Sequence, residues 1–336
     1  MWYDPIKTLS YNCILNFIIG NRGGGKTFGC VEWCIKDFKR RGAQFIYLRR
    51  YGTEFENIKA FFKSQKKIKF PEIEFEVTGS EEKGGEFIIN GECAGYYIAL
   101  STAAKLKSID YSEVYNIIYD EFLIDKGMYH YLPHEVRAML NFYETVARLR
   151  EGVRMFFLAN AITFTNDYFI AFDLHYPRNN SKVYVNRERG CLVQLVEDEE
   201  FIKAKNKTSF GKLIAGTEFA EYSINNKSLQ DNLDFVERKT DGARFCFAFV
   251  YDGFNYGVWL DYTVGKFWVS MNVDPSNKIV YALTLDDHKP NTMLLQKARQ
   301  SAWLRPFVDS YRLGNVYFES MRIKNVTMKA IKLLIM

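Results

Sequence analysis

The strongest chemical signal in the sequence is a glycine-rich segment that ends in Lys26 and Thr27. Residues 20–27 read Gly-Asn-Arg-Gly-Gly-Gly-Lys-Thr and fit the G-x-x-x-x-G-K-[ST] pattern of a phosphate-binding loop (P-loop) at every position. Glycines allow backbone conformations in which consecutive N–H groups converge on phosphate oxygens. We therefore expect Lys26 to reach the β- and γ-phosphates of ATP and Thr27 to be a ligand of Mg²⁺. The predicted nucleotide-contacting residues are Gly20, Arg22, Gly23, Gly24, Gly25, Lys26 and Thr27.

A second signal is the segment 115–121, Tyr-Asn-Ile-Ile-Tyr-Asp-Glu, an apolar run that ends in two adjacent acids. Such a strand is typical of a Walker B element. We expect Asp120 to hold Mg²⁺ through water and Glu121 to polarise the attacking water as a general base. Acids at strand ends often only cap turns, but the P-loop upstream makes the catalytic interpretation the stronger one.

The region between the two motifs indicates the class of P-loop protein. Residues 44–50 have the composition of a strand and lie between the motifs in the sequence, so this strand can sit between the P-loop strand and the Walker B strand. A glutamate directly after the magnesium aspartate points the same way. Both features favour the additional-strand (ASCE) class of P-loop ATPases over small GTPases and nucleotide kinases.

Three arginines near the end of a predicted helix, Arg148, Arg150 and Arg154, are candidates for an arginine finger. Such a residue stabilises the transition-state charge at the γ-phosphate of a neighbouring subunit. Arg148 is the first candidate for a finger in trans, and Lys107, in the loop before the Walker B strand, is a second candidate in trans. Asn160 ends the strand after Walker B, where a polar sensor can contact the γ-phosphate. The alternative is that the arginines only cover the negative end of the helix dipole.

Two further groups of cations are candidates for phosphate or DNA contacts. Arg49 and Arg50 end the strand 44–50, and we expect a solvated strand end for at least one of them. From Lys289 onward the chain carries nine Lys or Arg residues against two acids. A basic segment of this kind either contacts a polyanion or forms a solvated helix surface.

The periodicity predicts an α/β domain followed by a smaller α+β domain. Apolar strands alternate with helices in the first 160 residues, which predicts a parallel sheet with right-handed crossovers. Three later strands joined by tight turns predict an antiparallel meander. The expected boundaries are 1–196 for the P-loop domain, 197–228 for a polar linker and 229–336 for the C-terminal domain.

Composition excludes several classes of protein. The 336 residues are 48% apolar and 25% charged with a net charge of +5, unlike disordered or collagen-like chains. No apolar stretch approaches the ~18 residues that span a bilayer, and the N-terminus does not resemble a signal peptide. The six cysteines form no C-x-x-C pair. We expect a cytoplasmic protein without a membrane partner, with ATP and Mg²⁺ as cofactors and no other metal site.

Several segments together resemble the DNA-packaging ATPases of phi29-like phages. They are residues 15–27 (LNFIIGNRGGGKT), 44–51 (QFIYLRRY), 120–122 (DEF), 144–150 (ETVARLR), 210–218 (FGKLIAGTE) and 256–261 (YGVWLD). The similarity runs along nearly the whole chain and is therefore more specific than a P-loop alone. One departure is that residues 52–57 carry no Lys or Arg, so the sequence does not support a DNA contact by that loop.

The resemblance implies a homomeric, usually pentameric, ring that translocates double-stranded DNA at the portal vertex of a prohead in the host cytoplasm. It also implies packaging RNA and the portal (connector) as partners, and an RNase H-like C-terminal domain that is thought to have lost cleavage. Asp252 and Asp261 are at strand ends where nuclease acids could lie. The alternatives are a helicase-like ATPase, a nuclease-active terminase, or a scaffold that binds ATP only for assembly.

Overall fold

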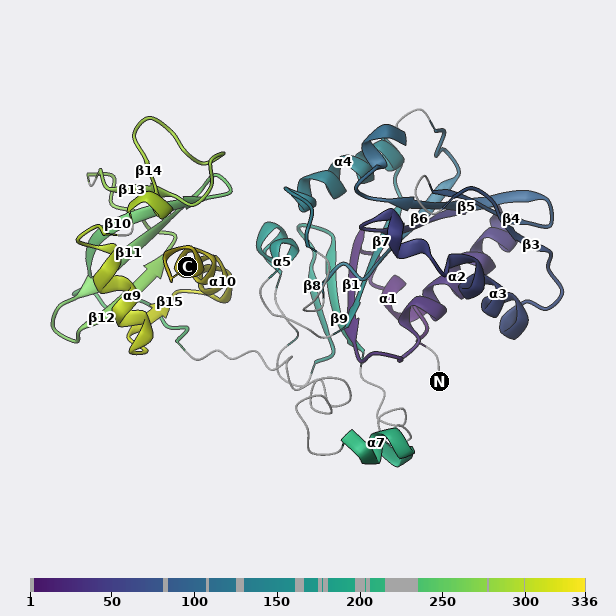
Figure 1. The fold of residues 1–336 in the computed structure, drawn as a ribbon, viewed down its shortest axis with the longest axis horizontal. Helices are drawn as coiled ribbons and strands as arrows, with labels where there is room; N and C mark the ends of the chain where they lie inside the picture. The colour runs from purple at the N-terminus through teal and green to yellow at the C-terminus, as the bar shows by residue number, and fades with distance from the viewer. Residues whose placement is uncertain are drawn as a thin grey trace. The chain divides into compact units, whose positions relative to one another are not determined.

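The computed structural model divides the chain into two compact units (Figure 1). It describes residues 3–80, 84–106, 109–124, 130–160, 166–174, 177, 181–196, 203, 206–214, 235–276, 278–298 and 300–335. The first unit comprises Met1–Thr163 and Leu174–Gln230, and the second comprises Phe164–Asp173 and Asp231–Met336. None of the described helices is long and apolar enough to cross a membrane.

The first unit contains a nine-stranded sheet with the order β3-β4-β5-β2-β6-β7-β1-β9-β8. The central strands β5, β2, β6, β7, β1 and β9 are parallel, and β3, β4 and β8 add antiparallel edges. The strands are β1 (Leu15–Gly20), β2 (Gln44–Arg49), β3 (Phe75–Val77), β4 (Gly85–Ile89), β5 (Glu92–Ala99), β6 (Val114–Asp120), β7 (Arg154–Asn160), β8 (Val183–Asn186) and β9 (Cys191–Val196). The predicted parallel sheet is confirmed.

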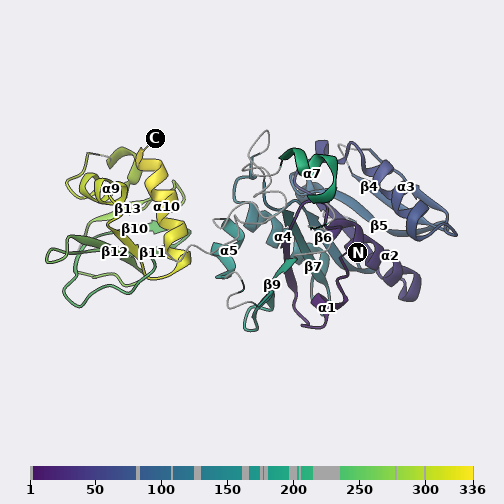
Figure 2. The same cartoon turned by 90° about the horizontal axis from the view of Figure 1, so that it is seen from below.

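The strand between the P-loop strand and the Walker B strand is β7, not the strand of residues 44–50. β7 pairs with β1 on one side and with β6 on the other, whereas β2 lies beyond β6. Our expectation for residues 44–50 was therefore wrong, because neighbours in a parallel sheet need not follow chain order. Figure 1 labels β1, β7 and β6 in the first unit, and Figure 2 shows β6 and β7 in the middle of that unit.

Helices cover both faces of this sheet. On one face, α2 (Lys26–Arg41) and α3 (Ile58–Lys69) form a core with side chains such as Ile118. Successive residues of a strand point to opposite faces, so Tyr119 lies on the other side, where its hydroxyl contacts α4 (Glu135–Ala147). The other helices in the described part of this unit are α1 (Ile6–Leu9), α7 (Ser209–Ile214) and the 3₁₀ helices η1 (Gly52–Phe55) and η2 (Ala103–Leu106). Most of the expected linker 197–228 falls outside the described residues.

The second unit is built on a six-stranded sheet with the order β14-β13-β10-β11-β12-β15. The predicted antiparallel meander is formed by β10, β11 and β12, and β13 and β15 join it in parallel. Its elements are β10 (Arg244–Tyr251), β11 (Phe254–Asp261), β12 (Lys266–Ser270), β13 (Val280–Ala282), β14 (Met293–Leu294), η4 (Leu295–Ala298), α9 (Leu304–Arg312), β15 (Val316–Phe318) and α10 (Met321–Ile335).

A helix from the expected first domain belongs to this second unit. α5 (Asp167–Phe172) follows β7 in the sequence, but Ile170 packs in the core formed by β10–β13, α9 and α10. Lys329 of α10 forms an ion pair with Asp167, and Arg322 lies 4.0 Å from Asp173 just after α5. The residues of the two units are thus interleaved in the sequence.

Candidate nucleotide-binding site

The loop between β1 and α2 has the backbone conformation that its glycines predict. Gly23 and Gly25 adopt φ values of 89° and 74°, which disfavour other residues. Gly20 is needed for a different reason, because a Cβ there would lie 2.2 Å from the carbonyl oxygen of Val196. The loop then leads directly into α2, whose free N–H groups and positive dipole end form an anion site.

Lys26 is buried at the start of α2, and its ammonium is directed to the loop. Nζ donates hydrogen bonds to the carbonyl oxygens of Gly20 (3.1 Å) and Asn21 (2.9 Å) and to Oδ1 of Asn160 (3.5 Å). Burial lowers the pKa of Lys26 to about 8, although the negative charge of Asp120 acts in the opposite direction. Lys26 and the predicted sensor Asn160 are therefore in contact beside the P-loop.

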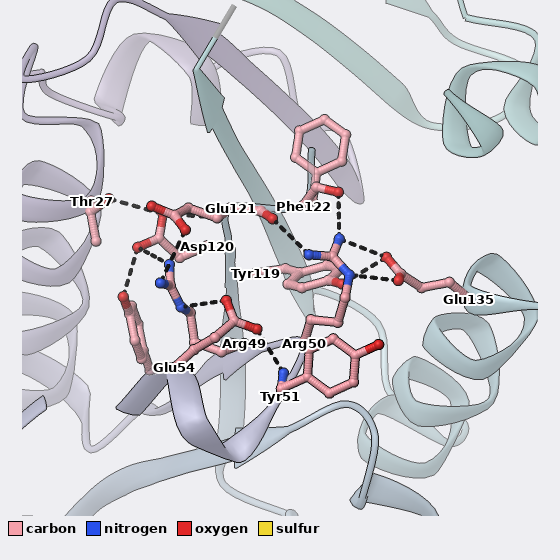
Figure 3. Close-up of polar contacts among 11 residues, drawn as sticks. Thr27, Arg49, Arg50, Tyr51, Glu54, Tyr119, Asp120, Glu121, Phe122 and Glu135 are labelled. Atoms are coloured by element: carbon pink, nitrogen blue, oxygen red, sulfur yellow. Dashed lines mark hydrogen bonds and ion pairs between the residues drawn. The ribbon is translucent and has the colours of Figure 1, made fainter. Parts of the chain in front are cut away.

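Thr27 and Asp120, the two predicted magnesium ligands, are in direct contact (Figure 3). The hydroxyl of Thr27 donates a 3.0 Å hydrogen bond to Oδ1 of Asp120, and the buried hydroxyl of Tyr47 donates a 2.6 Å hydrogen bond to Oδ2. Hydroxyl and carboxylate oxygens beside a phosphate loop are ligands that suit Mg²⁺, which usually completes its shell with water and phosphate. The donor set therefore fits magnesium.

Arg49 connects the two acids at the end of β6. Its guanidinium lies 3.3 Å from Asp120, 3.1 Å from Glu121 and 3.3 Å from Glu54, with 14% of its side chain exposed (Figure 3). Arg50, the next residue, is 2% exposed. The expectation that one of these arginines is a solvated strand end was wrong, because both point to carboxylates brought there by other elements.

Most of the predicted residues border one cavity of 320 Å³, but Gly20, Gly24 and Arg148 do not line it. It is lined by Arg22, Gly23, Gly25, Lys26, Thr27, Phe28, Phe61, Asp120, Glu121, Ala159 and Asn160. The side chain of Glu121 is 55% exposed there, so water can reach it. Sequence reasoning missed Phe28 and Phe61, which had no signal beyond their place on α2 and α3. Lys107 lies outside the described residues.

The three candidate finger arginines have different surroundings. The side chain of Arg150 donates hydrogen bonds to the carbonyl oxygens of Tyr111, Ser112, Val114 and Val146. Arg154 donates to Oδ1 of Asn12 (2.8 Å). Arg148 is exposed, and among the described residues its guanidinium has no hydrogen-bond or ion-pair partner. The contacts of Arg150 with its own subunit argue against a finger role for it, whereas Arg148 is accessible.

The two candidate nuclease acids lie at opposite ends of the β10–β11 hairpin. Asp252 is in the turn that joins the strands, and Asp261 is the last residue of β11, roughly 24 Å away at 3.4 Å per residue. Asp261 accepts hydrogen bonds from Thr240 (2.6 Å) and from the backbone of Thr263 (2.8 Å). Within the described part of the chain, no three His, Cys, Asp or Glu residues are grouped as metal ligands.

Comparison with known proteins places this geometry in a family. The model of the family described as "Podovirus DNA encapsidation protein (Gp16)" matches residues 1–335. The chain belongs to this family. It is 38% identical to the DNA packaging protein of Bacillus phage phi29 over 326 residues, which covers 97% of this chain and 96% of the relative. It is 36% identical to the DNA packaging protein of Bacillus phage B103 over 318 residues.

Solved structures of family members agree with this assignment. The phi29 genome packaging motor assembly matches 99% of this chain and 99% of the solved chain, with 36% identity and a TM-score of 0.76. The crystal structure of the N-terminal domain of the phi29 DNA packaging ATPase covers 60% of this chain and 98% of that domain, with 38% identity and a TM-score of 0.54. The chain is thus a member of a family of DNA-packaging ATPases, and the resemblance inferred from the motifs is confirmed.

Proposed function

We propose that the chain binds ATP with Mg²⁺ in the cavity at the end of β1, β6 and β7 and uses hydrolysis to drive double-stranded DNA into a prohead. The observation that carries this proposal is the meeting of Thr27 and Asp120 beside the P-loop, with Lys26, Asn160 and Glu121 around the same cavity. The position of β7 between β1 and β6 supports the additional-strand class.

Each residue has a separate role in this mechanism. Lys26 and the N–H groups of the P-loop bind the phosphates, and Asn160, which already contacts Lys26, senses the γ-phosphate. Thr27 and Asp120 hold Mg²⁺, which neutralises phosphate charge when it is bound. Glu121 orients and polarises the attacking water from the exposed side of the cavity.

Arg148 completes the site of a neighbouring subunit in the proposed ring. Its exposed guanidinium supports this role, because a finger in trans must be free to leave its own subunit's surface. We extend the proposal to a homomeric ring, for which a pentamer is the family's expected form. The partners are double-stranded DNA, packaging RNA and the portal, and the site of action is the prohead vertex in the host cytoplasm.

The second unit supports an RNase H-like fold without nuclease activity. Three antiparallel strands are followed by β13 and β14, which add in parallel beside β10. The separation of Asp252 from Asp261 argues against a nuclease-active terminase, because two-metal cleavage needs converging carboxylates. A helicase-like ATPase remains the second candidate, and the similarity along the whole chain to packaging proteins favours the motor.

ATP-dependent packaging into purified proheads tests the proposal. We expect the full chain to hydrolyse ATP and to package DNA, which is then protected inside the prohead from added nuclease. Asp120→Asn should lose both activities. DNA unwinding without packaging would favour the helicase alternative. Packaging by Asp120→Asn at the normal rate would contradict the assignment of the site.

A further inference from the structure

Arg50 is a buried cation whose contacts lie directly behind the catalytic end of β6 (Figure 3). Its Nε and Nη2 donate hydrogen bonds to the two carboxylate oxygens of Glu135 on α4, at 2.6 and 2.9 Å. The same guanidinium also donates to two backbone carbonyl oxygens, from Nη1 to Glu121 (3.2 Å) and from Nη2 to Phe122 (2.7 Å). A single side chain thus connects α4 to the backbone carbonyls of the two residues that follow Asp120.

The carboxylate of Glu135 accepts hydrogen bonds from other groups besides the guanidinium of Arg50. Glu135 is 4% exposed and accepts further hydrogen bonds from the hydroxyl of Tyr119 (2.8 Å) and the backbone N–H of Leu132 (2.9 Å). The ring of Tyr131 lies 4.9 Å from the guanidinium carbon of Arg50. A buried ion pair contributes little net stability, because desolvation offsets most of the attraction. The two backbone carbonyls satisfy the remaining donors of the guanidinium, and through them Arg50 also contacts the main chain that follows β6.

One of these carbonyls belongs to Glu121, whose backbone conformation is unusual. Glu121 has a φ of 55°, a left-handed conformation that is unfavourable for a residue with a side chain. Its N–H donates to Oδ1 of Asp120 (3.1 Å), and its carbonyl accepts from Arg50 (3.2 Å). Hydrogen bonds on both sides of the residue hold this strained conformation, which requires support from its surroundings to persist.

We propose that Arg50 is a positioning residue for hydrolysis, which fixes the backbone of Glu121 so that its carboxylate faces the nucleotide cavity. This inference rests on the proposed role of Glu121 as the general base. The two neighbouring arginines divide the work, because Arg49, the last residue of β2, and Arg50, directly after it, contact different parts of Glu121. Arg49 contacts the carboxylate of Glu121, and Arg50 holds its main chain.

The variant Arg50→Lys tests the inference. Lysine keeps the positive charge opposite Glu135 but lacks the planar fork that reaches two carbonyls at once. We expect kcat for ATP to fall roughly tenfold or more, since small misplacements of catalytic groups have effects of this size. The Kd for ATP with Mg²⁺ should stay within about twofold of the original, because the P-loop and Thr27 are untouched.

A matched control is available on α2. Arg41 also forms a two-point contact with a carboxylate, donating to Oδ1 and Oδ2 of Asp37 at 2.8 and 2.7 Å, but it does not contact Glu121. Arg41→Lys therefore loses a fork of the same geometry in the same unit. Arg41 is 43% exposed and Arg50 only 2%, so the melting temperatures of both variants are measured beside kcat. We expect its kcat to stay within twofold of the original value. Equal losses in the two lysine variants would overturn the inference, since any loosened ion pair would then slow hydrolysis.

A double-mutant cycle distinguishes positioning from a general structural effect. If Arg50 acts through Glu121, then adding Arg50→Lys to Glu121→Gln should lower the remaining kcat no further, because residues that act as a unit are not additive. An additional loss equal to that of Arg50→Lys alone would overturn the inference. An unchanged kcat in Arg50→Lys would overturn it as well.

A second variant covers the case in which Arg50→Lys does not fold. Glu135→Gln keeps the volume of the side chain but weakens the anchor of Arg50, and we expect the same loss of kcat and the same lack of additivity with Glu121→Gln. Additive losses would again contradict the inference. If Glu121→Gln itself hydrolyses ATP normally, the general-base assignment fails and this inference fails with it. If Glu121→Gln loses turnover as expected but Arg50→Lys keeps the original kcat, the general-base assignment stands and only this inference is contradicted.

Discussion

Thr27 and Asp120 are far apart in the sequence, yet the hydroxyl of Thr27 donates a 3.0 Å hydrogen bond to the carboxylate of Asp120. The contact joins the first turn of α2 to the end of β6. Both oxygens are thereby held in place for one small cation. We expect Thr27→Ser to keep Mg²⁺-dependent hydrolysis, because serine retains the hydroxyl, and Thr27→Val to lose it. A magnesium titration of ATPase activity checks this, and equal activity of the two variants would exclude Thr27 as a ligand.

Replacing Tyr47, which contacts the same carboxylate, should weaken Mg²⁺ binding less than replacing Thr27 by valine. Its buried hydroxyl donates to Oδ2 of Asp120 (2.6 Å), so Tyr47→Phe removes the hydrogen bond while keeping most of the volume. Partners of metal ligands typically contribute roughly tenfold or more to metal affinity. We therefore expect about tenfold more Mg²⁺ to be needed for half-maximal hydrolysis. In the control Tyr97→Phe, a buried hydroxyl that donates to Thr78 is removed instead, and the magnesium requirement should not change.

The sequence predicted the local parts of this site and missed those that depend on tertiary packing. The P-loop and the acids Asp120 and Glu121 were recognised because their chemistry depends on spacing along one segment. Burial of Arg50 depends on Glu135, which α4 brings from elsewhere in the chain. The hydrogen bonds of Arg150 were missed for the same reason, because its four carbonyl partners come from two separate segments.

The fold shows the same division. Strand and helix positions in the first unit follow from hydrophobic periodicity, and the parallel sheet follows from their alternation. The place of β7 between β1 and β6 and the packing of α5 in the second unit could not be predicted, because neither leaves a local pattern. Contacts between distant segments decide both.

Variants of Lys26 and Glu121 should distinguish ATP binding from ATP hydrolysis. Lys26→Ala removes the ammonium from the P-loop and should abolish ATP hydrolysis and DNA packaging together. Glu121→Gln keeps a side chain of the same size and should bind ATP and Mg²⁺ while turnover stops. Equilibrium binding of a fluorescent ATP analogue, measured beside ATPase activity, distinguishes the two variants. Equal loss of affinity in both would show that Glu121 is structural.

The second unit should not cut DNA. Asp252 and Asp261 lie at opposite ends of the β10–β11 hairpin, and Asp261 is engaged by Thr240 and Thr263. We expect no cleavage of double-stranded DNA by the full chain with Mg²⁺ or Mn²⁺, and a lower melting temperature for Asp261→Ala. Metal-dependent cleavage that Asp261→Ala abolishes, without loss of stability, would contradict this reading and favour an active terminase.

Arg148 and Arg150 should differ sharply when each is replaced by alanine. Arg150 donates to four carbonyl oxygens and so joins the end of α4 to residues 111–114. Arg150→Ala should therefore lower the melting temperature. Arg148 is exposed, so Arg148→Ala should fold normally and bind ATP, yet hydrolyse it poorly. Loss of an arginine finger typically costs roughly a thousandfold in turnover. Thermal melts and ATPase assays of both variants provide the comparison.

Mixed rings decide whether Arg148 acts in trans. A ring that contains Arg148→Ala and Glu121→Gln subunits includes interfaces at which an intact Glu121 faces an intact Arg148 from the neighbour. These interfaces should recover turnover that neither variant shows alone. An arginine acting in its own subunit predicts no recovery, because every subunit then carries one complete defect. The finger's effect is large, so even partial complementation is measurable. Turnover that stays at the background of the separate variants, in rings shown to be mixed, would rule out the assignment in trans.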